Sequence, residues 1–416
     1  MSSGGQPSPF TLFKNSQFSW LFASNIAFFF AMQAQFALRA WLAFKMTDSE
    51  FALGMMVFAI AVPMFLLSPF GGVMADKKNR RNLIIVGQFI AFALDLLILI
   101  LLLTDNLKFW HLLSSSAVMG CAFPFIMPAR NAIVVNVVGK SRLEHAMAIN
   151  MGGVNMARFL GPAAAAFLID FVGAAHAYLM GVSLFGVGLL FMTRVRSSIS
   201  SSGTKTLSPV ESVVEGVVYM KKNTLVLILL VFGLVPMFLA MPFQNLLVVF
   251  AEKVWQAGPL GFGFLSAAFG VGGVIGSLWV AIIRNTYARL RKMMITCLAF
   301  GVFLFGFSIT PYFGLGLVLV FLANVCLNVF NTLNNTAIQL LIPDRVRGRI
   351  SSFLMMSFSL PLLGTLPVSA IAEAYGAPFA VGLTSVLATL VCLLFYVFSK
   401  DLRRMDEKVK NARELV

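Results

Sequence analysis

Four of the asparagines in the largely apolar run between residues 312 and 342 recur at helical intervals. Their spacing of 4, 3 and 4 residues places them on one narrow face of an α-helix, at Asn324, Asn328, Asn331 and Asn335. A stripe of amides can line a wet cavity that hydrogen-bonds an organic molecule. Amides also hold neighbouring helices together, but that role needs one or two of them rather than a continuous stripe. The stripe therefore predicts a binding cavity on this face.

Two further pairs of amides extend this prediction to other apolar runs. Asn25 and Gln33 lie in the first run, on a face that includes an aromatic side chain, which suits an amphipathic organic molecule. Gln244 and Asn245 follow two prolines in the seventh run. Proline removes a backbone donor and bends a helix, so this segment fits a gating element as well as it fits simple curvature. We expect all four amides to contact a substrate.

Arginines also occur inside apolar runs. Arg158 lies about fourteen residues into its run, which at 1.5 Å per residue is roughly 20 Å deep and close to the midplane of a bilayer. A charge at that depth costs roughly 2.5 to 3.5 kcal/mol and needs a partner, water or a substrate. We therefore expect Arg158 and Arg130 to contact an anion or to take part in coupling. Arg39 lies near the outer end of the first run, where its side chain is expected to reach the lipid headgroups.

Asp95 is the only acid well inside any apolar run. A buried carboxyl group can bind and release a proton during a transport cycle, which makes Asp95 the candidate for proton coupling. A structural ion pair or another polar contact would explain the same residue. Both interpretations remain open on the sequence.

The elements that hold these residues are twelve apolar runs separated by short polar breaks. The chain has 416 residues, of which 59% are apolar and 11% are charged, and its mean hydropathy is +0.90. A membrane-spanning helix needs roughly 20 apolar residues, so we predict an all-α membrane protein with twelve transmembrane helices. The runs are 18–43, 51–75, 82–104, 109–137, 144–171, 174–194, 223–251, 258–283, 292–310, 312–342, 348–372 and 377–399.

The cations that give the net charge of +15 are distributed unequally among the breaks between these runs. Most of the 31 Lys and Arg lie in alternate breaks and in the two tails, whereas Lys45, Lys108 and Lys253 lie in the opposite breaks. Because cytoplasmic loops carry the excess of Lys and Arg, this pattern predicts both termini in the cytoplasm. The excess attracts anionic lipid rather than nucleic acid. We expect a multi-pass protein of the bacterial inner membrane.

The chain divides into two halves at its longest polar interruption, which is Ser-rich. An offset of 205 residues places Pro162 over Pro367 and Ala132-Ile133 over Ala337-Ile338. Matches at one offset indicate parallel duplication of a six-helix unit. The predicted parts are a cytoplasmic tail (1–17), a six-helix bundle (18–196), a cytoplasmic linker (197–222), a second six-helix bundle (223–400) and a cytoplasmic tail (401–416).

The break after the second run combines glycines, one acid and several cations. Glycines let helices approach closely, and the cations remain on the cytoplasmic side. The spacing of Gly72, Asp76, Arg80 and Arg81 resembles the loop between the second and third helices of major facilitator superfamily transporters. The resemblance implies two pseudo-symmetric six-helix bundles that give alternating access to a cavity. It also implies that this loop is a gating motif, which stabilises the outward-open state by closing the cytoplasmic side.

A second resemblance narrows the branch of the superfamily. Pro128-Ala129-Arg130-Asn131, Ala146 to Asn150 and Gly161-Pro162 are similar to the enterobactin-exporter-like and macrolide-efflux-like branch. Gly161-Pro162 also resembles the fifth-helix gating motif of antiporters, although alanines replace the flanking glycines. Many members of the branch carry an acid in the first helix, around Phe29-Phe30, where this chain has none. The resemblance implies export of an amphipathic drug or siderophore-like molecule in exchange for protons.

We predict a secondary active transporter, not an enzyme, that works as a monomer on a neutral or anionic small molecule. The candidate residues are mainly amides and arginines, whereas lipophilic cations usually need a buried carboxylate. Uptake or lipid flipping on the same fold, or a non-transporting membrane protein, are the alternatives. No phosphate-cradling Gly-x-x-x-x-Gly-Lys sequence occurs, and His111, His145 and His176 lie far apart. We therefore expect no ATP, metal or other cofactor, and protons as the coupling ion.

Overall fold

The computed structural model describes residues 9–139, 142–196, 223–282, 289–342 and 360–407. For residues 9–10, 69, 72–73, 75–77, 144, 281–282 and 360 it describes the backbone alone. All regular structure over these ranges is helical. The helices are η1 (Pro9–Lys14), α1 (Ser16–Thr47), α2 (Glu50–Lys77), α3 (Arg80–Leu103), α4 (Phe109–Val138), α5 (Leu143–Val172), α6 (Ala174–Thr193), α8 (Thr224–Leu239), α9 (Phe243–Val249), η3 (Phe250–Val254), α10 (Gly258–Ile282), α11 (Arg289–Ile309), α12 (Phe313–Leu341), α14 (Leu360–Leu363), α15 (Thr365–Tyr375), α16 (Ala377–Phe398) and α17 (Lys400–Arg403).

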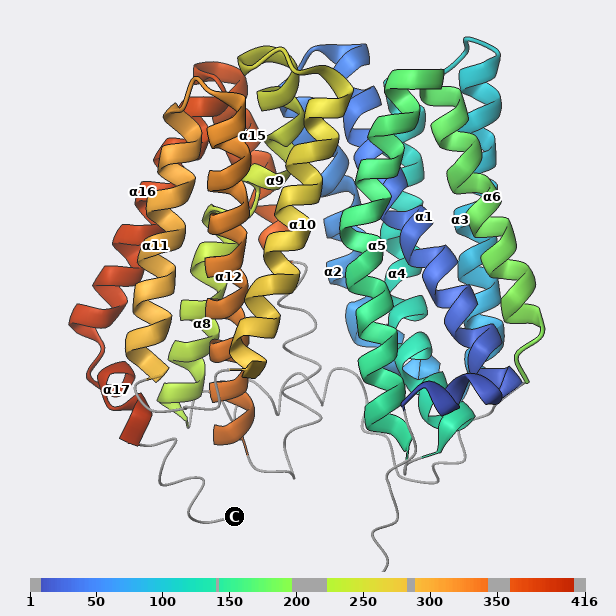
Figure 1. Ribbon diagram of the computed structural model, residues 1–416, viewed down its shortest axis with the longest axis horizontal. Coiled ribbons are helices and arrows are strands. Elements are labelled where there is room, and N and C mark those ends of the chain that lie inside the picture. The colour runs from blue at the N-terminus through green and yellow to red at the C-terminus, as the bar shows by residue number, and fades with distance from the viewer. Residues whose placement is uncertain (1–8, 140–141, 197–222, 283–288, 343–359, 408–416) are drawn as a thin grey trace, which may run out of the picture.

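These helices form two bundles that lie side by side, α1 to α6 and α8 to α16 (Figure 1). Among the described residues, 11 helical segments are long and apolar enough to cross a membrane. The predicted run 348–372 lies partly outside the described residues, and α14 and α15 form its remainder. The bundles contact each other through α5 with α10 and through α2 with α14 and α15. The predicted all-α fold with two membrane-spanning bundles is confirmed.

The seventh run is interrupted rather than one continuous helix. The first part, α8, ends at Leu239, and α9 begins at Phe243 and continues into the π-helical η3. Pro236 lies in the last turn of α8, and Pro242 directly precedes α9. Because proline has no N–H to donate to the preceding turn, the regular helix breaks between them. The break places Gln244 and Asn245 at the start of α9.

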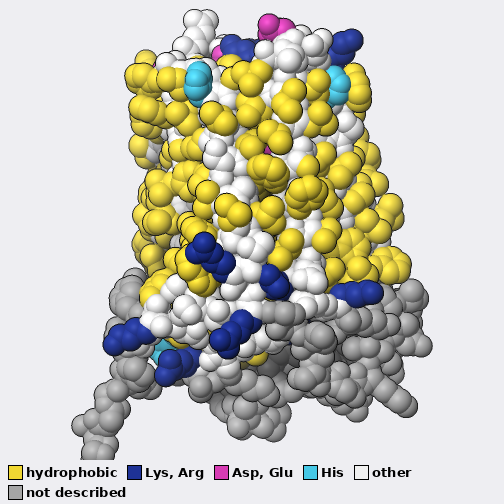
Figure 2. Space-filling model, turned by 90° about the vertical axis from the view of Figure 1, so that its right-hand side faces the viewer, with side chains coloured by type: hydrophobic (Ala, Val, Ile, Leu, Met, Phe, Trp, Pro, Cys, Tyr) yellow, Lys and Arg dark blue, Asp and Glu magenta, His cyan; other side chains and the backbone are white. Residues whose placement is uncertain are grey.

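The outside of the molecule carries an apolar belt with cations gathered below it (Figure 2). Large apolar side chains such as Phe167, Leu190 and Val302 are exposed on this surface. Exposed apolar area of this extent fits contact with lipid rather than water. We call the end that carries the C-terminal end of α2 and the N-terminal end of α3 the basic end, because the cations Lys78, Arg80 and Arg81 lie there.

Two arginines of the predicted gating motif bind the ends of neighbouring helices. Arg80 donates to the carbonyl oxygen of Ala132 at 3.2 Å and to Asn136 Oδ1 at 2.9 Å, in the last two turns of α4. Arg81 donates to the carbonyl oxygens of Met192 and Thr193 at the end of α6. The last carbonyls of α6 lack partners within the helix and carry partial negative charge, so the guanidinium of Arg81 stabilises this helix end.

The rest of that motif falls in the last two turns of α2. Gly72 and Asp76 belong to the helix, and the side chain of Asp76 lies outside the described part of the chain. Its gating contact therefore stays a prediction. The neighbouring Gly71 lets α2 approach α4 closely. A Cβ at this position would lie only 1.9 Å from the carbonyl oxygen of Pro124, which is too close for any side chain. Pro128 lacks the N–H that would otherwise bond to this carbonyl, so α2 and α4 meet at an irregular turn.

The predicted gating pair Gly161-Pro162 lies where α5 crosses α1. A Cβ on Gly161 would come within 3.0 Å of the α1 backbone, at the N of Ala34 and the carbonyl oxygen of Phe30. Glycine therefore permits direct contact between the two backbones. Pro162 faces the space between the bundles, which is described next.

Candidate functional site

A cavity of about 500 Å³ lies between the two bundles. Volumes of roughly 300 to 1,000 Å³ are usual for sites that bind small organic molecules. Its wall combines apolar side chains with several convergent polar groups from five helices. The polar lining residues are Gln33 of α1, Asn155 and Arg158 of α5, Gln244 and Asn245 of α9, Ser266 and Ser277 of α10, and Asn324, Asn328, Asn331, Thr332, Asn334 and Asn335 of α12.

Seven of the nine residues predicted to contact substrate line this cavity. They come together because α1 and α5 of one bundle face α8 to α10 and α12 of the other. That these side chains contact a substrate stays a prediction. The seven are Gln33, Arg158, Gln244, Asn245, Asn324, Asn328 and Asn331.

The asparagine stripe of α12 combines both roles that its spacing allowed. Asn324 is buried and donates to the carbonyl oxygen of Phe269, so it ties α12 to α10. Asn328 donates to the carbonyl oxygen and Oδ1 of Asn324 at 3.0 and 3.1 Å. Further along the stripe, Asn331 lines the cavity and Asn335 is exposed within it. The stripe therefore begins as a helix contact and continues as a polar cavity wall.

Some lining residues were not among the predicted sites. Asn334 is buried and donates to the carbonyl oxygen of Leu229 at 3.1 Å, which joins α12 to α8. Asn155 lies three residues before Arg158 and so shares its helix face. From this spacing, the sequence could have predicted that Asn155 lies beside Arg158 in the cavity wall. Ser266 and Ser277 gave no signal, because isolated serines occur in many membrane helices.

Arg158 is the only charged side chain among the described residues that line the cavity. It projects from the middle of α5 and is exposed to the open space. A solvated arginine avoids most of the cost of burying a charge, and its five donors suit a carboxylate, a phosphate or a cluster of carbonyls. The cavity can therefore hydrogen-bond a neutral polar molecule or an anion.

Asn25 and Arg130 lie elsewhere, in a buried cluster behind α1. Arg130 donates to Asn25 Oδ1, and Asn25 in turn donates to Asn150 Oδ1 at 2.9 Å. The guanidinium of Arg130 also lies 4.0 Å from the ring centroid of Phe28. Eight residues separate Asn25 from Gln33, which turns them by roughly 80° around the helix. That rotation directs Asn25 toward α4 and α5, whereas Gln33 faces the cavity.

Asp95 forms an ion pair with Arg39 inside the first bundle. The contact joins Asp95 Oδ1 to Arg39 Nη2, and both residues are buried, with Asp95 only 1% exposed. The prediction that Arg39 reaches the headgroups is wrong. The reason is that the carboxylate of Asp95, on α3, lies beside Arg39 and pairs with it. The sequence does not indicate that α3 packs against α1 at this point. That Asp95 couples protons stays a prediction.

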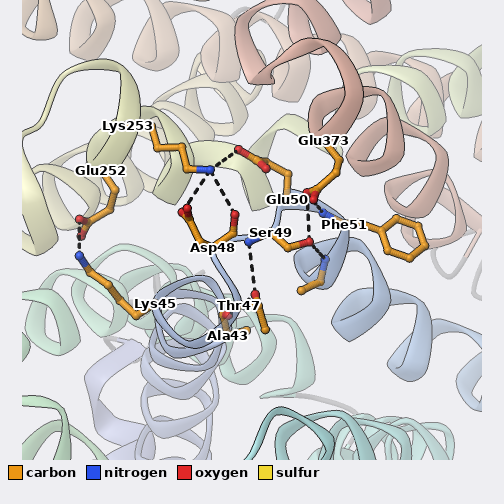
Figure 3. A network of polar contacts seen from close by, with 11 residues as sticks. Ala43, Lys45, Thr47, Asp48, Ser49, Glu50, Phe51, Glu252, Lys253 and Glu373 are labelled. Atoms are coloured by element: carbon orange, nitrogen blue, oxygen red, sulfur yellow. Dashed lines mark hydrogen bonds and ion pairs between the residues drawn. The ribbon is translucent and has the colours of Figure 1, made fainter.

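The end opposite to the basic end is closed by polar contacts between the bundles (Figure 3). Lys45 of α1 lies 2.8 Å from Glu252 of η3. Lys253 lies 3.2 Å from Asp48 and 3.0 Å from Glu50, at the α1–α2 turn. We call this the sealed end and these residues the latch.

A further contact extends the latch to α15. Glu373 accepts hydrogen bonds from the Ser49 hydroxyl at 3.0 Å and from the Phe51 N–H at 3.1 Å. The start of α2 is thereby held against both η3 and α15 of the second bundle. At the other end, the cavity lining continues to Asn335 and Ile338, in the last two turns of α12. The cavity therefore extends toward the basic end and is closed at the sealed end.

Comparison with known proteins agrees with this arrangement. Residues 7–415 match the transmembrane secretion effector family of the major facilitator superfamily, and the chain belongs to this family. It is therefore a membrane transporter and not an enzyme.

Relatives of the chain include transporters named for staphyloferrin A, macrolides and enterobactin. A staphyloferrin A transporter from Staphylococcus aureus is 20% identical over 87% of this chain and 91% of its own. A macrolide efflux protein from Streptococcus pyogenes is 22% identical, with coverage of 87% and 90%. An enterobactin exporter from Escherichia coli is 25% identical, with coverage of 74% and 73%. The predicted resemblance to the enterobactin-exporter and macrolide-efflux branch is confirmed.

Solved structures give the same fold. A nucleoside transporter aligns with a TM-score of 0.74 at 13% identity, over 92% of this chain and 100% of its own. At this identity the likeness concerns the fold alone.

Proposed function

We propose that this protein exports an amphipathic small molecule, neutral or anionic, in exchange for protons. Export takes place by alternating access, with the basic end and both termini in the cytoplasm of a bacterium and the chain in its inner membrane. The present conformation is then inward-open, and the monomer is the working unit. The observation that supports the proposal most strongly is the composition of the cavity wall, which has many amides and one arginine but no carboxylate among its described residues.

The wall also indicates what kind of molecule fits. Apolar side chains such as Phe36, Met237 and Phe269 offer contact to rings or acyl groups, while the amides offer donors and acceptors in pairs. Without a carboxylate, a lipophilic cation would lose its hydration with no charge partner in return, and Arg158 would repel it. The staphyloferrin, macrolide and enterobactin relatives are consistent with cargo of this polar and apolar character.

Proton exchange is supported by Asp95, a buried acid that borders a side chamber of the cavity. A carboxyl group that alternates between a proton and an ion-pair partner can link proton movement to a conformational change. ATP is an unsuitable energy source here, because the chain has no phosphate-binding loop.

Transport into everted membrane vesicles tests this proposal. Vesicles that contain the protein should accumulate fluorescent drugs or a siderophore when respiration acidifies their interior, and an uncoupler should stop the accumulation. A panel of anionic, neutral and cationic probes of similar size separates the substrate classes. Accumulation that favours cations, or that persists with the uncoupler, contradicts the proposal. Accumulation only in right-side-out vesicles would indicate uptake instead.

A further inference from the structure

The wall of the main cavity divides into two arcs of different polarity. The helices around the cavity follow one another in the order α1, α5, α10, α12 and α8, because α5 contacts α1 and α10, and α12 contacts α10 and α8. The chain continues from α8 into α9, which contacts α1 and completes the ring. Apolar and polar side chains occupy different parts of this ring.

The apolar arc consists of α8 and the neighbouring part of α1. Every described lining residue of α8 is apolar or glycine, and Met241 continues the series beyond the end of the helix. The lining residues of α1 that follow Gln33 are apolar as well. Methionine side chains are flexible and polarizable, so they adapt to a hydrocarbon surface. The largest members of the arc are Leu230, Leu234, Met237 and Met241, with Phe36 of α1.

The polar arc is the rest of the ring, from α5 to α12. Asn155 and Arg158 line the cavity from α5, and most of the amides line it from α12. Asn328, Asn331 and Asn335 span seven residues of α12, which is roughly 10 Å at 1.5 Å per residue. Their amides therefore form a row with about 5 Å between neighbours.

The helix between α5 and α12 keeps the two polar helices close together. A Cβ on Gly270 of α10 would lie 2.6 Å from Cβ of Phe159 on α5, and one on Gly273 would lie 3.0 Å from Nδ2 of Asn324 on α12. Glycine thus removes bulk where both helices pack against α10. The lining residues of α10 are themselves mixed, with two serines and with phenylalanines in the half nearer to the sealed end. Arg158 and the amide row therefore face one continuous space.

A cargo that fills this space has to match both arcs at once. An amide that is covered by hydrocarbon loses its water without gaining a hydrogen bond, and a hydroxyl group pressed against Met237 or Leu234 loses its water in the same way. A polar head on a plain apolar chain matches only part of the wall, because the chain covers amides. A rigid molecule with polar groups on one face and hydrocarbon on the other matches both arcs, and its rigidity lowers the entropy lost on binding.

We propose that the cargo is a facially amphipathic anion. It has a rigid ring system with an acidic group at one end, polar groups about 5 Å apart along one face and hydrocarbon on the opposite face. The inference rests on the proposed export of an amphipathic molecule and names the kind of amphiphile. The acidic group binds Arg158, the polar face exchanges hydrogen bonds with Asn331 and its neighbours in the row, and the hydrocarbon face packs on Met237.

Two bile acids serve as matched probes, since they share one ring skeleton and one carboxylate. Cholate carries three hydroxyl groups on one face, whereas lithocholate carries a single one. Isothermal titration calorimetry of the protein in lipid nanodiscs, with empty nanodiscs as the blank, measures binding at concentrations below those that form micelles. We expect Asn331→Leu to weaken cholate binding about tenfold, because hydrogen bonds to its hydroxyl face are lost, and to change lithocholate binding less than about twofold.

Two further variants examine the other arc and the helix itself. Met237→Gln keeps the length of the side chain and places an amide in the apolar arc, so it should weaken both bile acids several-fold. Thr336→Val is the control on α12, since Thr336 is exposed and does not line the cavity. It should leave both affinities unchanged. All variants are compared as monodisperse protein.

The outcomes separate this inference from the proposed function. If Asn331→Leu weakens both bile acids equally, or if the wild-type protein binds neither, the facial arrangement is overturned, whereas export is still decided by the vesicle experiment. Full affinity in Met237→Gln would also contradict the inference, because the hydrocarbon face then does not lie on α8. The expected binding pattern together with accumulation that persists with an uncoupler would keep this inference and overturn proton exchange.

Discussion

Arg158 is the residue whose removal should change substrate choice most directly. It is the only cation among the described cavity residues, and a hydrogen bond to a charged group contributes about 1.5 to 3 kcal/mol. We expect Arg158→Ala to weaken binding of anionic probes by roughly tenfold to a hundredfold, with a small effect on neutral ones. Titration of purified protein with fluorescent probes measures this. Arg158→Lys keeps the charge and should keep most of the affinity for anions; an equal loss for neutral probes would instead indicate a structural defect.

The pair of Asp95 and Arg39 allows its structural and coupling roles to be separated. Asp95→Asn leaves a buried arginine without its partner, which costs about 3 to 5 kcal/mol. Replacing both members by neutral groups, with Asp95→Asn and Arg39→Gln together, should recover much of this stability. Thermal unfolding in detergent measures the effect. We expect both variants to lose dependence on the proton gradient, and a double variant that regains gradient-driven export would show that the pair is only structural.

Single residues were predictable where helical spacing alone decides the answer. The prediction for the asparagines of α12 required only that the segment form a regular helix with one face toward the cavity. Asn25 and Arg39 depended on which helix packs behind α1, and their partners Arg130 and Asp95 are 105 and 56 residues away. No local pattern records contacts over such separations, so the sequence could not assign these partners.

At the scale of elements, the latch joins the α1–α2 turn to η3 and should set the balance between conformations. Lys253 contacts two carboxylates, one of them the largely buried Glu50. We expect Lys253→Gln to destabilise the sealed conformation by about 1 kcal/mol, which changes the ratio of open to sealed molecules by about fivefold. Spin labels at Asp105→Cys and Tyr312→Cys, one on each bundle at this end, would report the change as a larger population of long distances.

The matched control for this prediction is Lys108→Gln. Lys108 is an exposed cation at the same end, and it lies on the α3–α4 turn of the first bundle. Its loss removes the same charge without touching the latch. If both variants give the wild-type distance distribution, the latch does not determine the conformation.

Helices were more predictable than the way in which they are interrupted. The described helices follow the apolar runs because any lipid-facing backbone must satisfy its hydrogen bonds within a helix. The break between α8 and α9 does not follow from the sequence, since a proline can either kink a helix or end it. The π-helical η3 had no signal at all. It nevertheless carries Glu252 and Lys253, so the sequence could not assign these two residues to contacts between the bundles.

At the scale of the whole molecule, the proposed alternating access requires that the two bundles separate at the sealed end. The latch and the cavity both lie between surfaces that belong to different bundles, so a single rocking movement changes both. Lys45 and Glu252 are in contact across this boundary at 2.8 Å. A covalent link between these two positions should therefore stop transport without removing the binding site, because neither Lys45 nor Glu252 lines the cavity.

A reversible thiol crosslink makes this last expectation measurable. With the native cysteines replaced by serine, Lys45→Cys and Glu252→Cys joined by a short cleavable crosslinker should reduce export to background, and cleavage should restore it. Probe affinity in detergent should stay within about threefold of the uncrosslinked protein, since less than 1 kcal/mol of binding energy is at stake. Each single cysteine variant treated with the same reagent is the control. Full export by the crosslinked protein would mean that the sealed end does not open, and a rocking movement of two bundles would then be the wrong description.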